Sequence, residues 1–216
     1  MIINKLNLIE NEIQLKIDVN KHYPKIIAVS KTHEMNNILP LIEYGHKNFG
    51  ENKVQEALLK WKDVKLEYPD IKLHMIGKIQ TNKVKYVVEL FDYVHSLDSI
   101  NLAKKISVEQ KKKEKYLKIF IQVNIGNEPQ KSGISTDKIN EFYNSCVNDL
   151  KLNIVGLMCL PPNDDNSNLY FKKMQNLKET IGLNELSMGM SGDYLEAIKY
   201  GSTFLRIGSK IFGDRN

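Results

Sequence analysis

The sequence predicts a closed (β/α)8 barrel of the TIM type with an extra helix at its N-terminus. Short apolar runs that fit strands buried on both faces alternate with stretches of helical spacing, eight times along 216 residues. Strict alternation indicates a parallel sheet covered by helices, and eight units in this length match a closed barrel. An open doubly wound sheet is the alternative, but it usually carries a GxGxxG turn after its first strand, and none is present here.

Each expected element follows from its own pattern. Apolar side chains at helical spacing predict the extra helix at residues 3–19, and Gly45 and Pro161 are typical of residues that end a helix and a strand. The strands are expected at 26–30, 47–50, 72–77, 93–95, 117–123, 154–158, 186–188 and 204–207. The helices are expected at 35–44, 51–61, 81–90, after Asp98 or Ser99, and at 136–147, 168–180 and 194–200.

Composition argues against several classes of protein. No apolar stretch approaches the roughly 18 residues of a membrane span, and the N-terminus lacks the features of a secretory signal, so we expect a cytoplasmic protein. Cys146 and Cys159 have no CxxC spacing, which favours buried free thiols over a zinc or redox site. The net charge is +5, but the dense lysine run at 111–115 has no interleaved aromatic residues. We interpret that run as a solvated loop and expect no nucleic-acid binding.

Arginine occurs at only two positions, Arg206 and Arg215, although the chain has 31 basic residues. A chain that otherwise uses lysine invites the question whether these positions need a planar guanidinium. Arg215 lies in the terminal tail, so Arg206 is the candidate.

Lys31 directly follows the first buried strand. Barrels place their chemistry in the loops at the carboxyl ends of the strands. Partial desolvation at such a position lowers the pKa of a lysine towards the nucleophilic free amine. The alternative is a lysine that buries only its aliphatic stem, and the C-terminal part of the chain weighs against that alternative.

Two late loops repeat one pattern of strand, glycine and serine, then the start of a helix: residues 187–193 and 206–213. Glycines allow backbone N–H groups to turn towards a ligand, and helix N-termini favour anions. Barrels often bind phosphate in the loops after strands seven and eight. A phosphate site opposite a strand-end lysine is the layout expected for pyridoxal 5′-phosphate (PLP) held as a lysine Schiff base. Plain helix caps are the alternative for either loop alone.

As a set, these motifs resemble the pyridoxal-phosphate homeostasis protein family, whose barrel is similar to the N-terminal domain of bacterial alanine racemases. The matching stretches are AVSKT at 28–32, FGEN at 49–52, HMIG at 74–77 with Gln80 and Asn82, QVN at 122–124, KSG at 131–133, GLM at 156–158, SMGMS at 187–191 with Asp193, and residues 201–213. They cover nearly the whole chain in order. The resemblance implies one PLP-binding barrel domain over residues 1–216. Lys78-Ile79 departs from the family pattern, which affects the expected local shape only.

The resemblance also implies residue roles. Lys31 would be the Schiff-base lysine, and Arg206 would lie near the pyridine nitrogen. Asn52 and His74 match positions that line the same mouth. The full set implied to bind the cofactor is Lys31, Asn52, His74, Ser191, Arg206, Gly208 and Ser209.

Arginine has donors and no acceptor, so Arg206 would pair only with an unprotonated pyridine, which disfavours carbanion stabilisation. Alanine racemases share this feature, but they add a C-terminal domain and a tyrosine from a partner subunit. This sequence ends at Asn216, directly after the last expected barrel element, so we expect a mouth open to solvent.

We therefore expect a non-catalytic, monomeric PLP carrier that keeps free PLP low and supplies apo PLP-dependent enzymes. One alternative is a PLP-dependent amino-acid racemase-like enzyme. Another is a protein that binds a phosphorylated sugar or a nucleotide, with Lys31 as a structural residue.

Overall fold

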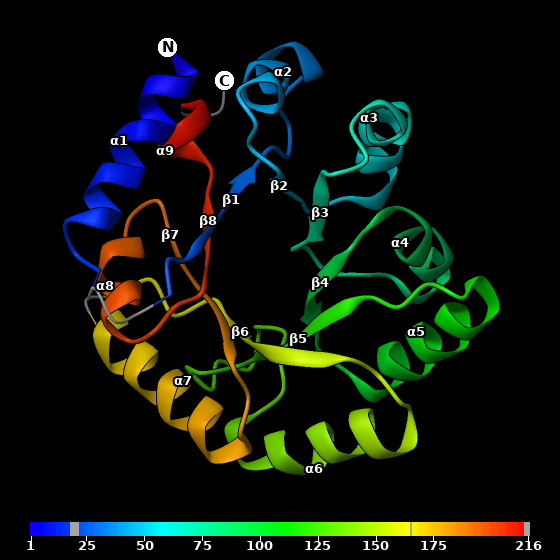
Figure 1. Ribbon diagram of the computed structural model, residues 1–216. Coiled ribbons are helices and arrows are strands. Elements are labelled where there is room, and N and C mark those ends of the chain that lie inside the picture. Colours follow the sequence, from blue (N-terminus) through cyan, green and yellow to red (C-terminus); the bar gives the residue numbers. More distant parts are fainter. Residues whose placement is uncertain (18–21, 165, 214–216) are drawn as a thin grey trace.

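The computed structural model describes residues 1–17, 22–164 and 166–213 and shows a closed parallel barrel ringed by helices (Figure 1). The strands follow one another around the barrel in chain order, and the last pairs with the first. They are β1 Lys25–Val29, β2 Asn48–Glu51, β3 Lys72–Met75, β4 Tyr93–Leu97, β5 Lys118–Val123, β6 Ile154–Cys159, β7 Glu185–Met190 and β8 Phe204–Ile207. The predicted (β/α)8 fold is confirmed.

Helices connect the strands on the outside of the barrel. They are α1 Ile2–Gln14, α2 Met35–Glu43, α3 Val54–Glu67, α4 Val84–Leu90, α5 Ile100–Lys113, α6 Ile139–Asn144, α7 Ser167–Ile181, α8 Tyr194–Lys199 and α9 Ser209–Phe212, with short 3-10 or π segments at Thr81–Lys83, Thr136–Lys138 and Ser145–Asp149. Ser99 caps α5, as the sequence allowed, because its side chain accepts a hydrogen bond from the N–H of Leu102.

Several boundaries differ from the prediction. The N-terminal helix ends at Gln14, and residues 18 and 19 of the expected helix lie outside the described residues, as does Arg215. Helix α3 begins at Val54, because Glu51 still belongs to β2. The lysine run at 111–115 is only partly a loop, since Lys111–Lys113 form the last turn of α5. Cations are favourable at that end of a helix, which explains why the helix continues through them.

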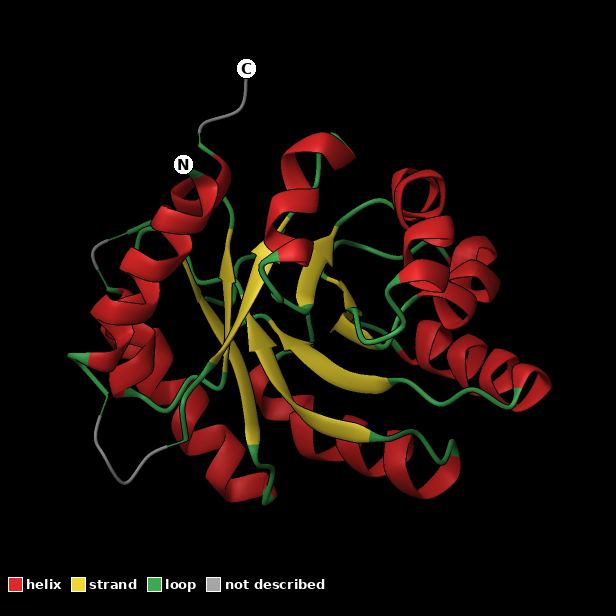
Figure 2. Cartoon of the chain, turned by 45° about the horizontal axis from the view of Figure 1, so that its top comes forward, coloured by secondary structure: helices red, strands yellow, loops and turns green. Residues whose placement is uncertain are grey.

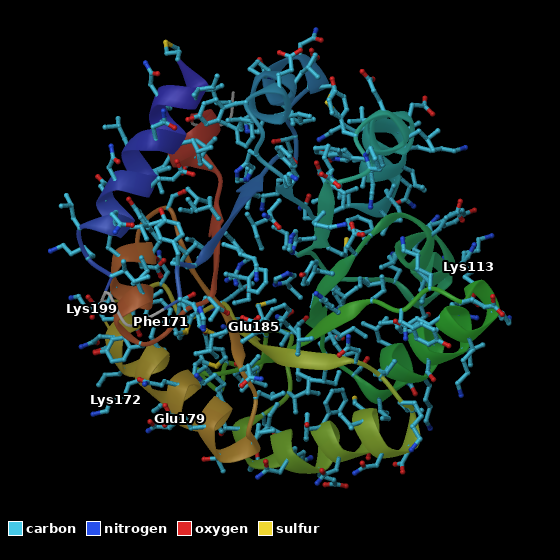
Figure 3. All side chains as sticks on the ribbon, viewed as in Figure 1. Lys113, Phe171, Lys172, Glu179, Glu185 and Lys199 are labelled. Atoms are coloured by element: carbon cyan, nitrogen blue, oxygen red, sulfur yellow. The ribbon has the colours of Figure 1, made fainter. Side chains whose placement is uncertain are left out.

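The barrel has an inner core and an outer core. Inside, one apolar side chain from each of several strands forms a cluster: Ile27, Tyr93, Phe120, Met158 and Phe204. Outside, the strands pack against the inner faces of the helices. On α7, Phe171 is fully buried against the barrel, whereas Lys172 and Glu179 point away from it (Figure 3).

Helices α1 and α9 come from opposite ends of the chain and lie side by side (Figures 1 and 2). Helix α9 has only four residues, and α1 also contacts α2 and α8. The apolar face that predicted α1 is the one it buries, through Leu6, Ile9 and Ile13.

Both cysteines are buried and free, as predicted. Burial raises the pKa of the Cys159 thiol to about 12, so it stays protonated. Within the described residues no helix has the length and apolar character to span a bilayer.

Candidate functional site

A cavity of about 410 Å³ opens at the carboxyl ends of the strands. Residues that follow β1, β2, β3, β7 and β8 line it, so it lies on the face where a barrel places its chemistry. The predicted site residues in its lining are Lys31, Asn52, Ser191, Arg206, Gly208 and Ser209. The structure thus brings together six of the seven side chains or backbone segments that the sequence singled out.

A larger cavity of about 580 Å³ lies beside the first, against α1, α2 and α9. The two share His33, whose ring stacks on Phe212 with 4.6 Å between centroids. The larger cavity holds none of the predicted site residues. We therefore take the smaller one as the functional site.

Lys31 is held in place through its two chain neighbours. The Ser30 hydroxyl donates to Glu51 Oε1 at 2.7 Å. Thr32 has a φ of 67°, a left-handed conformation that is uncommon for threonine, and its N–H donates to Glu56 Oε1 at 2.6 Å. The backbone on both sides of Lys31 is therefore fixed, and its half-buried side chain lines the cavity.

Lys60 on α3 joins the two carboxylates that hold these neighbours. Its Nζ donates to Glu51 Oε1, to Glu56 Oε1 and to the backbone oxygen of Ser30, each at 3.0 Å. The side chains of Lys60 and Glu51 are 9% and 0% exposed, and Trp61 Nε1 also donates to Glu51 at 2.9 Å. A buried ion pair persists only when such hydrogen bonds compensate its desolvation. This cluster fixes the end of β1.

The loops after β7 and β8 meet at Ser191. Its Oγ accepts from the backbone N–H of Gly208 at 3.3 Å and from that of Lys210 at 3.4 Å. Backbone N–H groups at a helix start lack partners within the helix. The Ser191 hydroxyl accepts from these two N–H groups and still has its own hydrogen to donate, so it can hold an oxygen of an anionic ligand.

Arg206 is 4% exposed and borders the cavity. Its Nη1 donates to the Ser187 backbone oxygen and to the Ser187 hydroxyl, both at 2.6 Å, and its Nη2 donates to the Cys159 backbone oxygen at 2.8 Å. Burial lowers the pKa of the guanidinium, but arginine starts high enough to remain charged. A buried cation of this kind favours a ligand with negative charge or an exposed lone pair.

Asn52 presents a buried oxygen to the same region. Its Oδ1 has no hydrogen-bond partner among the described residues. An unpaired buried acceptor costs on the order of 1–3 kcal/mol, so a ligand donor there would be stabilising. Gly77 lies against Asn52 so closely that an added Cβ would be 2.2 Å from the Asn52 backbone oxygen. Only glycine fits that contact.

His74 is the predicted site residue that the structure places elsewhere. It is fully buried inside the barrel, and Ile76, two residues later, lines the cavity in its place. Gln80 and Asn82 are exposed and do not border the cavity either. Sequence alternation shows which strand residues point inwards, but it does not show how deep in the barrel each one lies.

Sequence reasoning missed Glu56 and Lys60, which lie on α3 and reach the end of β1 only once the barrel has folded. Ser187 stands in one of the motifs quoted above, but its contact with Arg206 was not predicted. The described residues contain no group of three or more His, Cys, Asp or Glu side chains that could hold a metal ion.

Known proteins match the chain over almost its full length. The family model for the alanine racemase N-terminal domain matches residues 3–216. A pyridoxal phosphate homeostasis protein from Vibrio alginolyticus is 40% identical over 202 residues, covering 89% of this chain and 87% of that protein. One from Aquifex aeolicus is 36% identical over 203 residues, covering 88% and 87%. The chain belongs to the pyridoxal phosphate homeostasis protein family.

Solved structures agree with this family membership. PipY of Synechococcus elongatus without PLP has a TM-score of 0.87 and 30% identity, covering 99% of this chain and all of that one. The form of PipY with PLP bound has a TM-score of 0.85. An alanine racemase from Corynebacterium glutamicum has a TM-score of 0.74 at 14% identity and is covered over 61% of its length. That likeness shows the shared barrel fold alone.

Proposed function

We propose that this protein binds PLP in the cavity at the carboxyl end of its barrel, through a Schiff base with Lys31, and supplies PLP without turning over an amino acid. The observation that carries the proposal is the convergence of Lys31, Arg206 and the Ser191–Gly208 contact on one cavity. The names of the relatives and the PLP-bound form of PipY support the same ligand.

The residues present fit such a ligand. PLP carries a phosphate, a pyridine nitrogen, a phenolic oxygen and an aldehyde. The Ser191 hydroxyl, together with the backbone at Gly208 beside it, would hold the phosphate. Arg206 would donate to the ring nitrogen, and the unpaired Asn52 Oδ1 would accept from a ligand hydroxyl. The charges of Lys31 and Arg206 complement the negative charge of the phosphate and the phenolate.

When bound, the cofactor supplies an aldehyde that condenses with a lysine amine to form a Schiff base and one water molecule. The chain contributes the rest. Glu51 and Glu56 hold Ser30 and Thr32, so the Lys31 side chain starts from a fixed place beside the cavity. Arg206 keeps its protons at working pH, so it would leave the ring nitrogen of a bound cofactor unprotonated. An unprotonated ring withdraws electrons weakly, which favours holding the cofactor over catalysis.

A racemase-like enzyme is the second candidate, because the matching family model is the alanine racemase N-terminal domain. The two functions differ in one observable. A racemase exchanges the α-proton of its amino acid with solvent, whereas a carrier does not.

Two assays on the purified protein test the proposal. Titration with PLP, followed by absorbance, is expected to saturate at one equivalent. Incubation of the loaded protein with each common amino acid in deuterated water is expected to leave the α-proton in place by NMR. Absence of PLP uptake would refute the proposed ligand, and α-deuteration would establish the racemase-like function instead.

A further inference from the structure

Inside the barrel, a chain of hydrogen bonds runs from Arg206 down to Asn48. Arg206 Nη1 lies 2.6 Å from Ser187 Oγ, and Ser187 Oγ lies 2.8 Å from His95 Nδ1. His95 Nε2 lies 2.9 Å from His74 Nδ1, and His74 Nε2 lies 3.1 Å from Asn48 Oδ1. The chain crosses the interior between β8, β7, β4, β3 and β2.

The direction of this chain follows from its two ends. A guanidinium only donates, so Ser187 Oγ accepts from Arg206, and the serine hydrogen remains to be donated to His95 Nδ1. At the other end, the Asn48 carbonyl oxygen only accepts, so His74 Nε2 carries a hydrogen. A neutral His74 then accepts at Nδ1, and His95 donates from Nε2. The Asn48 end requires this tautomer of each histidine, and the free hydrogen of the Ser187 hydroxyl is consistent with it.

The surroundings keep both histidines neutral. His74, His95 and Ser187 are each 0% exposed. Tyr93 stacks on His74 with 4.4 Å between ring centroids, and Phe120 stacks on His95 with 4.3 Å. Burial lowers the pKa of His95 well below its usual range, and the nearby His74 and Arg206 add to this effect. Burial likewise lowers the pKa of His74, with Lys25 adding to it.

We propose that Ser187, His95 and His74 are positioning residues, which hold Arg206 at a fixed place and orientation as a one-way hydrogen-bond donor to the ring nitrogen of the bound cofactor. The inference rests on the proposed PLP site, because Arg206 is the member of the chain that borders the cavity. The histidines themselves need not touch the ligand.

The hydrogen bonds of Arg206 within the barrel determine which of its donors remain for a ligand. Of its five N–H groups, both on Nη1 are used by Ser187 and one on Nη2 is used by Cys159. What remains is one N–H on Nη2 and the N–H on Nε. The site therefore selects a pyridine with a free lone pair and discriminates against a ring nitrogen that already carries a proton or a methyl group.

NMR of the ligand-free protein tests the direction of the chain. Long-range ¹H–¹⁵N spectra distinguish the tautomers of histidine side chains. We expect His74 and His95 each to carry the hydrogen on Nε2 at neutral pH. A hydrogen on Nδ1 of His95, or a doubly protonated ring on either residue, would overturn the proposal.

The variant Ser187→Ala tests the effect on the site, and Ser107→Ala is its matched control. Ser107 is also a buried serine that donates to a backbone oxygen, Leu150 O at 2.7 Å, but it lies on α5 outside the barrel. Loss of a hydrogen bond to a charged group is expected to raise the Kd for PLP by about tenfold or more in Ser187→Ala. The absorbance maximum of the bound cofactor should shift as well. Ser107→Ala should change neither.

Equal PLP affinity and spectrum in Ser187→Ala and wild type would overturn the proposal, as would equal losses in both serine variants. Should Ser187→Ala fail to fold, the variant Ser187→Thr, which keeps the hydroxyl, and the wild-type tautomers decide the matter. Absence of PLP binding by the wild-type protein would refute the proposed function. The NMR result would still show whether the hydrogen bonds from Arg206 to Asn48 run in the stated direction. The two failures are therefore distinguishable.

Discussion

The Arg206 guanidinium and the Ser187 hydroxyl lie 2.6 Å apart within a barrel interior where both side chains are almost completely buried. Ser187 also accepts from the same Nη1 through its backbone oxygen. The contact therefore fixes both the position and the rotation of the planar guanidinium. Arg206 also lines the cavity, so this contact fixes a guanidinium at the edge of the site.

Replacing Arg206 by lysine keeps the charge but removes the planar donor group. We expect Arg206→Lys to weaken PLP binding by about 10- to 100-fold, because charged hydrogen bonds contribute roughly 1.5–3 kcal/mol. Equilibrium titration with wild type and variant measures the change. An analogue with carbon in place of the ring nitrogen should bind wild type less tightly than PLP, and Arg206→Lys should show little preference between the two ligands. If wild type binds both equally, Arg206 does not face the ring nitrogen.

Lys60 stabilises the end of β1 through buried contacts. In Lys60→Ala, the fully buried Glu51 loses the cation that balances its charge, so we expect the free energy of unfolding to fall by about 3–5 kcal/mol. The control is Lys199→Ala, which breaks an exposed pair with Glu196 on α8 (Lys199 is labelled in Figure 3) and should cost at most about 1 kcal/mol. Urea denaturation of the two variants gives both values. Similar small losses would show that the buried cluster does not stabilise the fold.

Gly77 and Gly192 both line the cavity, but only Gly77 is closely packed. Comparing alanine at the two positions therefore tests the effect of close packing. A Cβ at position 77 would lie 2.2 Å from the Asn52 backbone oxygen, whereas a Cβ at position 192 would meet nothing within 4 Å. Gly77→Ala should therefore displace Asn52, lower stability by roughly 1–3 kcal/mol and weaken PLP binding, while Gly192→Ala changes little. Thermal unfolding and PLP titration measure both. Equal behaviour of the two variants would contradict the close contact.

The buried histidines make stability depend on pH. Their folded-state pKa values lie well below 6.5, so the unfolded chain binds more protons just below that pH. The free energy of unfolding should therefore fall as the pH drops from about 6.5 to about 5, by up to roughly 1.4 kcal/mol per pH unit for each histidine. His95→Gln should reduce this slope by the contribution of one histidine. Burial also lowers the pKa of His46, but His46 contributes equally to the wild-type protein and the variant. Identical slopes in denaturation series at several pH values would exclude His95 as a buried neutral histidine.

The fold was predictable because its signals are local. Most barrel strands are short and largely apolar runs that end near glycine, serine or proline, and strict alternation with helices leaves few topologies. The same alternation explains why Lys31 and Arg206 could be placed at one mouth, since β1 and β8 are neighbours once the barrel closes.

The contacts that hold Lys31 and Arg206 in place could not be predicted in this way. His95 appears in the sequence as one polar residue in an apolar strand, and nothing local shows that it meets Ser187, 92 residues later. His74 was expected at the mouth because it matches a family position there, but the alternation of side chains along a strand does not show how deep in the barrel a residue lies. The contacts of Lys60 depend on how α3 packs, which is a tertiary property.

The attachment of PLP to Lys31 is the central claim, and borohydride reduction of the PLP-loaded protein followed by peptide mapping tests it directly. We expect the reduced cofactor to be fixed to the peptide that carries Lys31. The variant Lys31→Ala should remain folded by circular dichroism and give no such adduct, while Lys199→Ala should label as wild type does. An adduct on another lysine, or none on the wild-type protein after exposure to PLP, would contradict the account.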